Sequence, residues 1–190
     1  LFFGPGYLTL HTGAVGAFRL LILTLAILLI DDRRSFPAGI LLALTMLKPP
    51  QGITILLLAG VWFLARKDWK AIIGVAFGGI MLLVIGLVQD PQWIQKFLGA
   101  SDAVMDRTLG VHSNVWAFAY LACDGASPCS TLLGGTLSLV LLSAAGIYLL
   151  RKQTKKSAWG GGNVIIPVGF FCTIYPLAYD QLLFIIPLFW

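Results

Sequence analysis

Glutamate is absent from this chain of 190 residues, and charged residues of all kinds make up only 11% of it. An ordinary soluble domain carries about 25% charged residues. Hydrophobic residues make up 58% of the chain, and the mean hydropathy is +0.90. These values exclude an ordinary soluble domain. They predict an all-α protein, a polytopic transmembrane helical bundle that includes short and broken helices.

The usual motifs of cofactor and metal chemistry are also missing. The sequence has no phosphate-binding GxxxxGK[ST] loop, no glycine-rich dinucleotide fingerprint, and no HExxH or CxxC metal pattern. Its two histidines, His11 and His112, are far apart. We therefore expect no metal site and no cofactor.

Cysteine is scarce, with three residues in the whole chain. Cys172 lies in an apolar run, where a cysteine usually packs as a small hydrophobic residue. Cys123 and Cys129 lie in a polar loop that we expect outside the cytoplasm. A disulfide between them is allowed there, and the sequence leaves open whether it forms.

The basic residues are concentrated at a few places. Nine of the thirteen lie in three short clusters, at 33–34, 66–70 and 151–156. Each cluster flanks an apolar segment, as cytoplasmic loops do under the positive-inside rule. We therefore expect a multi-pass protein of the cell membrane with its basic loops in the cytoplasm. The same distribution argues against a nucleic-acid partner.

Apolar runs of about spanning length predict helices at 14–30, 69–88 and 131–150. The second run carries four glycines, which predict close helix packing. The glycine-rich stretch 159–163 predicts a flexible turn before an outward run at 164–178.

Two polar residues bear on the ends of these segments. Arg19 interrupts the first run near its start, and it either extends to the outer interface or faces an internal cavity. Ser113 is expected to cap a short apolar helix over 114–122, which is too short to span a membrane.

The stretch Lys48-Pro49-Pro50-Gln51 separates two short apolar runs, 36–47 and 53–65. A lysine at the bilayer centre costs roughly 2.5–3.5 kcal/mol, and a proline inside a helix costs about 3 kcal/mol. Basic residues flank both outer ends, so the pair predicts a re-entrant hairpin with Lys48 at its tip. Such a tip must line a cavity, here on the non-cytoplasmic side. An ordinary hairpin with a surface lysine is the alternative.

Lys48 is the leading candidate for binding a phosphate, because a compact ammonium group at membrane depth suits this anion. Gln51 follows it directly and is expected on the same cavity. His112 and Asn114 lie where the outer loop re-enters the membrane, and they offer hydrogen bonds to a sugar. Asp180 pairs with Lys48, orients an acceptor hydroxyl or ends a solvated helix; these alternatives stay open.

The order of these motifs resembles glycosyltransferase family 87, the polyprenyl-phosphate-mannose-dependent mannosyltransferases and their bacterial relatives. The resemblance rests on short motifs in the same order over most of the chain: Ala38-Gly39 through Thr45-Met46-Leu47-Lys48-Pro49, Arg66-Lys67-Asp68-Trp69-Lys70, Ser113-Asn114, and Tyr175-Pro176 followed by Tyr179-Asp180-Gln181-Leu182. The chain departs from the family at Gly13-Ala14-Val15-Gly16, where members often carry Gly-Gln followed by Asn. This departure bears on the choice of donor or acceptor.

The resemblance implies a C-type membrane glycosyltransferase fold. It implies transfer of mannose or another hexose from a polyprenyl-phosphate donor to a glycan or glycolipid acceptor on the non-cytoplasmic side. Lys48 would contact the donor phosphate, and Tyr179 and Asp180 would line the cavity. The family's catalytic aspartate is expected upstream of Leu1, since we expect residues 1–190 to be a single transmembrane domain truncated at both ends.

Two other functions compete with sugar transfer. Broken helices with a charge at membrane depth also occur in transporters, so a transporter or flippase for a lipid-linked or anionic solute is the main alternative. Transporters often have two related halves, and the second half of this chain has no counterpart of Lys48-Pro49-Pro50. A structural subunit without chemistry would leave Lys48 unexplained.

Overall fold

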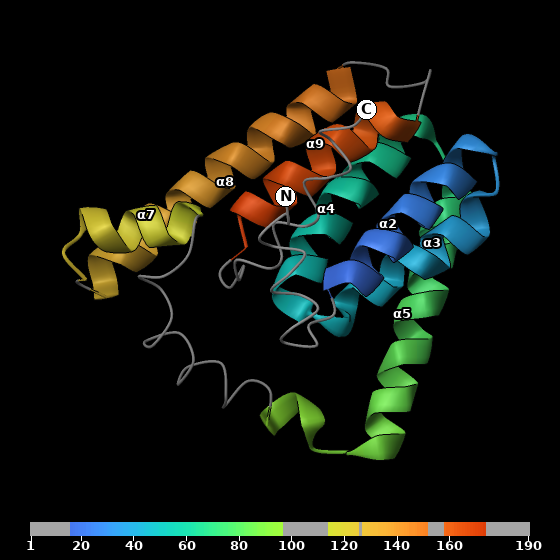
Figure 1. Ribbon diagram of the computed structural model, residues 1–190, viewed down its shortest axis with the longest axis horizontal. Coiled ribbons are helices and arrows are strands. Elements are labelled where there is room, and N and C mark those ends of the chain that lie inside the picture. Colours follow the sequence, from blue (N-terminus) through green and yellow to red (C-terminus); the bar gives the residue numbers. More distant parts are fainter. Residues whose placement is uncertain (1–15, 97–113, 126, 152–157, 174–190) are drawn as a thin grey trace, which may run out of the picture.

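The computed structural model describes residues 16–96, 114–125, 127–151 and 158–173, which are largely helical (Figure 1). The helices are α2 (Gly16–Asp31), α3 (Ser35–Ala43), the 3-10 helix η1 (Leu44–Leu47), α4 (Pro49–Arg66), α5 (Trp69–Gln89), α7 (Val115–Ala122), α8 (Ser127–Arg151) and α9 (Ala158–Phe171). The described residues contain no strand. The predicted all-α class is therefore confirmed.

Two of the described helices are long and apolar enough to cross a membrane, judged by length and composition: Trp69–Gln89 and Pro128–Leu150. They correspond to two of the predicted spanning runs. The third predicted run corresponds to α2, which begins and ends within two residues of the expected positions.

The apolar core lies where α2, α3, α4, α8 and α9 meet. Its most enclosed side chains include Leu23 of α2, Phe63 of α4, Leu149 of α8 and Ile166 of α9, each at most 2% exposed. The buried residues of α5 are all in its first half. Figure 1 shows the second half of α5 extending away from the rest of the bundle.

Glycines allow α3 and the first half of α5 to cross at backbone contact distance. A Cβ on Gly39 would meet the carbonyl oxygen of Ala71, and a Cβ on Gly74 would meet the carbonyl oxygen of Phe36. A Cβ on Gly78 would lie 2.7 Å from a side-chain atom of α3. The close packing predicted for the glycines of this run is therefore confirmed at Gly74 and Gly78.

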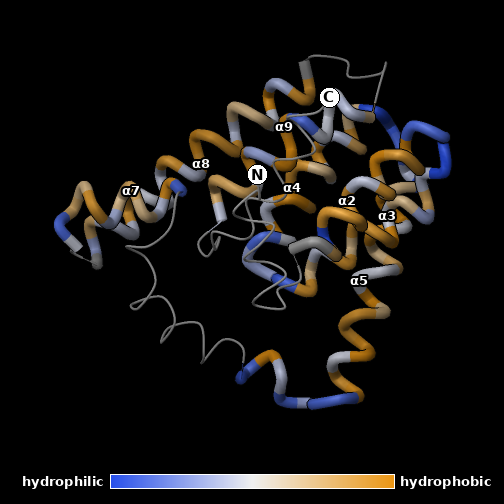
Figure 2. Tube along the Cα trace, in the orientation of Figure 1, coloured by the Kyte–Doolittle hydropathy of each residue, from blue (hydrophilic) through white to orange (hydrophobic). Residues whose placement is uncertain are grey.

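Two hydrogen bonds gather the polar turns at one end of the bundle. Ser35 Oγ donates to Asp68 Oδ2 at 2.6 Å, and the backbone N–H of Ala158 donates to Asp31 Oδ1 at 3.2 Å. The basic turns from α2 to α3 and from α4 to α5, together with the end of α8 at Arg151, share this end, which we call the basic end (Figure 2). The side of a membrane on which this end lies stays a prediction.

The stretch 159–163 was expected to form a flexible turn, and this prediction is wrong: it is helical and belongs to α9. Packing explains the difference. A Cβ on Gly161 would lie 2.5 Å from the indole of Trp62, and a Cβ on Gly162 would lie 2.8 Å from Ile27. These glycines bring α9 against α4 and α2, and the close packing offsets their poor helix propensity.

The break at Lys48 is confirmed, but it is narrower than expected. Pro49 and Pro50 occupy the first two positions of α4 and do not form a non-helical tip. Proline fits there because the first N–H groups of a helix have no intrahelical partner. The N–H groups of Gln51 and Gly52 donate to the carbonyl oxygen of Lys48 at 3.1 and 3.0 Å. Of the stretch 48–51, only Lys48 therefore lies outside the helices.

The cap of α7 is also one residue later than predicted. Asn114, not Ser113, is the N-cap, and its Oδ1 accepts a hydrogen bond from the N–H of Ala117 at 2.8 Å. Ser113 and Asn114 both suit this position, so residue type alone does not separate them. The following loop is shorter than expected, because α8 begins at Ser127.

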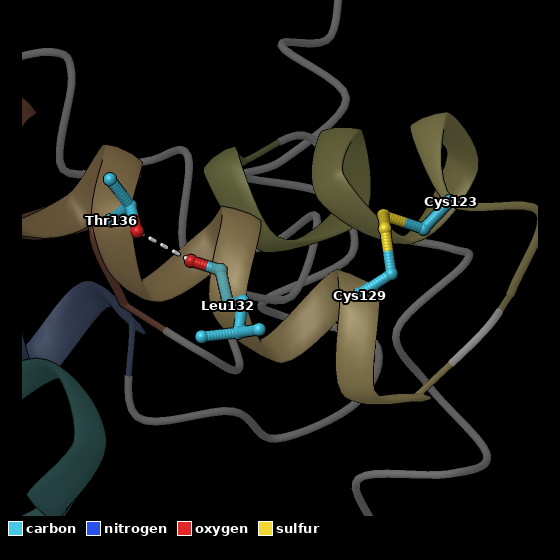
Figure 3. The surroundings of a disulfide bond; sticks show 4 residues. All are labelled: Cys123, Cys129, Leu132 and Thr136. Carbon is cyan, nitrogen blue, oxygen red and sulfur yellow. Dashed lines mark hydrogen bonds between the residues drawn. A yellow bond between two sulfur atoms is a disulfide. The ribbon is translucent and has the colours of Figure 1, made fainter.

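A disulfide joins Cys123, at the end of α7, to Cys129, in the first turn of α8 (Figure 3). This settles the alternative that the sequence left open. One turn further along α8, the Thr136 hydroxyl donates to the carbonyl oxygen of Leu132 at 2.7 Å, which satisfies this polar group within the helix. The disulfide ties α7 and α8 into a hairpin. Cys172 is a free, buried thiol.

Replacing Gly39 or Gly74 by alanine should destabilise the protein by about 1–3 kcal/mol, because the added methyl group would force two backbones apart. Gly60 is the matched control, since a Cβ there has no atom within 4 Å. Thermal unfolding in detergent measures the effect. Equal melting temperatures for Gly39→Ala and Gly60→Ala would contradict the close crossing.

Cys123 and Cys129 should resist alkylation in denatured, unreduced protein, whereas Cys172 should react. After reduction all three should be alkylated, as peptide mass mapping can measure. Cys123→Ser should also lower the free energy of unfolding by roughly 2 kcal/mol through the lost loop constraint. Alkylation of Cys123 without prior reduction would show that the bond does not form.

Candidate functional site

The break between η1 and α4 is the centre of the candidate site. Lys48 has φ −123° and ψ 86°, so the chain leaves the 3-10 helix here and enters α4 in a new direction. Its N–H donates to the carbonyl oxygen of Thr45 at 3.2 Å. The Lys48 side chain is half-buried. Lys48 thus lies at the junction of two helices, and its predicted role in binding a phosphate stays a prediction.

A groove of about 740 Å³ lies beside this junction. One wall is formed by Met46, Leu47 and Pro49, which include both chain neighbours of Lys48. The other wall comes from the second half of α5 and the turn after it: Gly79, Leu82, Leu83, Gly86, Gln89, Asp90, Trp93 and Ile94. The lining is mostly apolar, so the groove suits a hydrocarbon chain.

The polar end of the groove is formed by Asp90 and Trp93. Lys96 Nζ donates to Asp90 Oδ2 at 2.6 Å, and the N–H of Gln92 donates to Asp90 Oδ1 at 3.0 Å, so this carboxylate is already paired. The indole of Trp93 packs over Gly86, where a Cβ would lie 2.7 Å from Nε1. The Trp93 Nε1 atom is buried and has no hydrogen-bond partner among the described residues. It is a donor that a bound ligand can use.

A cluster of hydroxyl groups lies one turn further along α4. The Thr54 hydroxyl contacts the carbonyl oxygen of Gly169 at 2.8 Å and the Thr173 hydroxyl at 3.1 Å. Thr173 Oγ1 donates to the same carbonyl at 2.7 Å. These bonds join α4 to the end of α9. They fix the first turns of α4 and hence the position of Lys48.

Residues of α7 reach the same end of α9. Asn114 Nδ2 donates to the carbonyl oxygen of Thr173, and the Trp116 indole donates to the carbonyl oxygen of Cys172 at 3.1 Å. The disulfide-linked hairpin of α7 and α8 is therefore joined to the bundle near the Thr54 cluster. Both ends of the Asn114 amide take part in hydrogen bonds within the protein.

The structure brings some of the predicted site residues together. Lys48 and Gln51 lie within one turn of each other, and neither is among the residues that line the groove; Gln51 is only 1% exposed. Asn114 is 7% exposed and bonded as described above. The predicted contacts of Lys48, Gln51 and Asn114 with donor or sugar stay predictions. His112, Tyr179 and Asp180 lie outside the described residues.

Arg19 is a second basic group enclosed by the protein. It is 2% exposed, so its predicted extension to the outer interface is wrong, and the alternative of an inward-facing charge agrees with its burial. It lies in the first turn of α2, a helix that contacts η1. Burial of a charged group requires partners within the protein. The apolar residues beside Arg19 in the sequence do not show which segments enclose it.

Sequence reasoning also missed the groove and the residues Trp93, Thr54 and Thr173. A partial signal was present, because Gly79 and Gly86 are seven residues apart and so lie on one face of α5. Their different surroundings were not visible in the sequence: a Cβ on Gly79 has no atom within 4 Å, whereas Gly86 is covered by Trp93. Among the described residues, no group of three acidic, histidine or cysteine side chains gathers to hold a metal ion.

Comparison with known proteins adds to this geometry. The model of glycosyltransferase family 87 matches residues 1–176, most of the chain. No protein of curated function and no solved structure matches significantly. The chain therefore belongs to glycosyltransferase family 87, which makes it a membrane glycosyltransferase.

Proposed function

We propose that this protein transfers mannose or another hexose from a polyprenyl-phosphate donor to a glycan or glycolipid acceptor. Family membership supplies glycosyl transfer. The observation that carries the donor class is the apolar groove beside the Lys48 junction. A lipid-linked phosphate needs an apolar track with a cation near it, and the two chain neighbours of Lys48 line this groove.

The groove fits the lipid part of the donor. Its walls carry aliphatic side chains from η1 and α5, and burial of hydrocarbon there gains roughly 25 cal/mol per Å² of apolar surface. The chain neighbours of Lys48, Leu47 and Pro49, line it directly. A lipid in the groove therefore brings its phosphate close to the lysine.

The head group would be bound by two kinds of donor. The ammonium of Lys48 offers charge to the phosphate. The buried Trp93 indole N–H, which lacks a partner among the described residues, offers a neutral hydrogen bond from the opposite wall. A buried donor left unbonded is costly, so a ligand that accepts this bond gains affinity.

The reaction is a displacement at the anomeric carbon. The acceptor hydroxyl oxygen bonds to this carbon, the bond from the carbon to the phosphate oxygen breaks, and polyprenyl phosphate leaves with the electron pair. A general base takes the hydroxyl proton. Lys48 stabilises the charge that develops on the leaving phosphate.

Two observations favour placing the basic end in the cytoplasm. Basic turns gather there, as the positive-inside rule expects. The disulfide lies at the far end of α8 from Arg151, and disulfides persist in oxidising compartments outside the cytoplasm. The site at Lys48 then faces the non-cytoplasmic side, where the acceptor is proposed to lie.

Lys48→Ala in the full-length enzyme should lower sugar transfer by about 10²-fold or more, because the leaving phosphate loses its cation. Radiolabelled polyprenyl-phosphate sugars in membranes provide the assay. Lys48→Arg should retain part of the activity.

Lys96→Ala is the control for removal of a basic residue near the groove, and equal loss in both alanine variants would contradict a specific role for Lys48. Wild-type turnover in Lys48→Ala would contradict the assignment of Lys48 to the donor phosphate. Movement of the lipid-linked sugar across vesicles without any transfer would favour the transporter alternative.

Gly79→Leu should raise the KM for the long-chain donor about tenfold, because the new side chain occupies the groove and removes several buried methylenes of the lipid. Gly135→Leu is the matched control, since neither glycine has an atom within 4 Å of its Cβ position. Steady-state kinetics with donors of different isoprenoid length measure the effect. An unchanged KM for the longest donor would exclude the groove as its binding site.

A further inference from the structure

A second pocket lies at the basic end, remote from the Lys48 groove. It has a volume of about 420 Å³ and is lined by the turn from α4 to α5: Arg66, Lys67, Asp68, Trp69 and Lys70. Three cations and one acid thus surround one small space. The proposed sugar transfer uses none of these residues.

The acid in this pocket is already engaged elsewhere. Asp68 Oδ2 accepts the hydrogen bond from Ser35, and Oδ1 accepts one from the N–H of Ala71 at 3.3 Å, which caps α5. No ion pair joins Arg66, Lys67 or Lys70 to an acid among the described residues. The pocket therefore carries an excess of positive charge.

Arg66 has one polar atom without a hydrogen bond among the described residues. Its guanidinium lies over the Trp62 ring, 4.7 Å from the centroid, which fixes its position. Its Nη1 atom is buried and has no hydrogen-bond partner in the part of the chain that the structure describes. Buried polar atoms nearly always have a partner, and an exception calls for an additional bound group. A guanidinium donates its strongest hydrogen bonds to a carboxylate or a phosphate.

The backbone of Lys67 adopts a conformation that is strained for a lysine. Lys67 has φ 58° and ψ 33°, the left-handed conformation in which glycine is favoured. Arg33, at the end of α2, has the same conformation with φ 60°, but it does not line the pocket. Lys67 therefore places a cation at a position where glycine would be less strained.

The surroundings select an amphiphile over a free ion. Trp69 is 61% exposed at the rim, and the exposed apolar side chains Ile73 and Phe77 follow it on the same face of α5. Indole rings favour the level of lipid head groups, and the apolar stripe of Ile73 and Phe77 offers a surface for acyl chains. The charged pocket and the stripe are continuous along one helix.

We propose that this pocket binds the phosphate head group of an anionic membrane phospholipid, with the acyl chains along α5. Basic pockets beside membrane helices commonly hold such head groups. The lipid would fix the turn between α4 and α5 at the membrane surface. This inference does not depend on the donor or acceptor of the sugar transfer.

Lys67→Gly/Lys70→Gln should lower retention of phosphatidylglycerol by about tenfold or more, since each basic residue at an anionic surface strengthens binding roughly fivefold. Native mass spectrometry of the full-length protein in detergent measures the lipid retained. The melting temperature should stay equal or rise, because glycine relieves the strained backbone at position 67. Arg33→Gly/Arg34→Gln is the matched control, because it also removes two positive charges, includes a residue with positive φ (60°) and lies outside the residues that line the pocket.

Three outcomes would overturn the proposal. The first is equal retention of phosphatidylglycerol in the double variant and the wild type. The second is that the wild type retains phosphatidylcholine, which has no net charge, as well as it retains phosphatidylglycerol. The third is that inorganic phosphate alone raises the melting temperature as much as phosphatidylglycerol does, which would assign the pocket to the free anion. Sugar transfer measured in the same variants keeps this result separate from the proposed function.

Discussion

The contact between two helix backbones, where α3 crosses α5 at Gly39, Gly74 and Gly78, is the constraint on which the candidate site depends. Because α3 continues into η1, this crossing also sets η1 beside α5. The second half of α5 then extends past the break at Lys48, and the groove forms between them. Side chains at the crossing would separate the walls. In a membrane, where apolar burial drives helix association weakly, such close contact provides much of the packing energy.

The two ends of the bundle have different chemistry. At the basic end, Ser35 and Asp31 take part in hydrogen bonds that hold neighbouring turns together, and the cations of the α4–α5 turn remain available. Towards the other end, the Thr54 hydroxyl contacts the Thr173 hydroxyl, and the Asn114 amide donates to the carbonyl oxygen of Thr173. The basic end is therefore suited to the charged surface of a membrane, and hydrogen bonds between segments stabilise the other end, where Lys48 lies.

Much of the fold could be predicted from the sequence because long apolar runs, basic turns and a double proline act locally. The all-α class, the helices α2, α5 and α8, and the break at Lys48 follow from such signals. The remaining features depend on contacts between distant residues. Gly161 is helical only because the Trp62 indole packs against it, and Arg19 is enclosed by segments that its own neighbours do not reveal. The groove combines η1 with the far half of α5, so no single stretch encodes it.

The two prolines at the start of α4 have an electrostatic consequence. Helix N-termini often bind phosphate through free backbone N–H groups. Here Pro49 and Pro50 have no N–H to offer, and the next two N–H groups already donate to the carbonyl oxygen of Lys48. The end of α4 is thus closed to an anion as a backbone site. Any phosphate that approaches this junction must be recognised through side chains, which makes its binding depend on the reach of the Lys48 ammonium group.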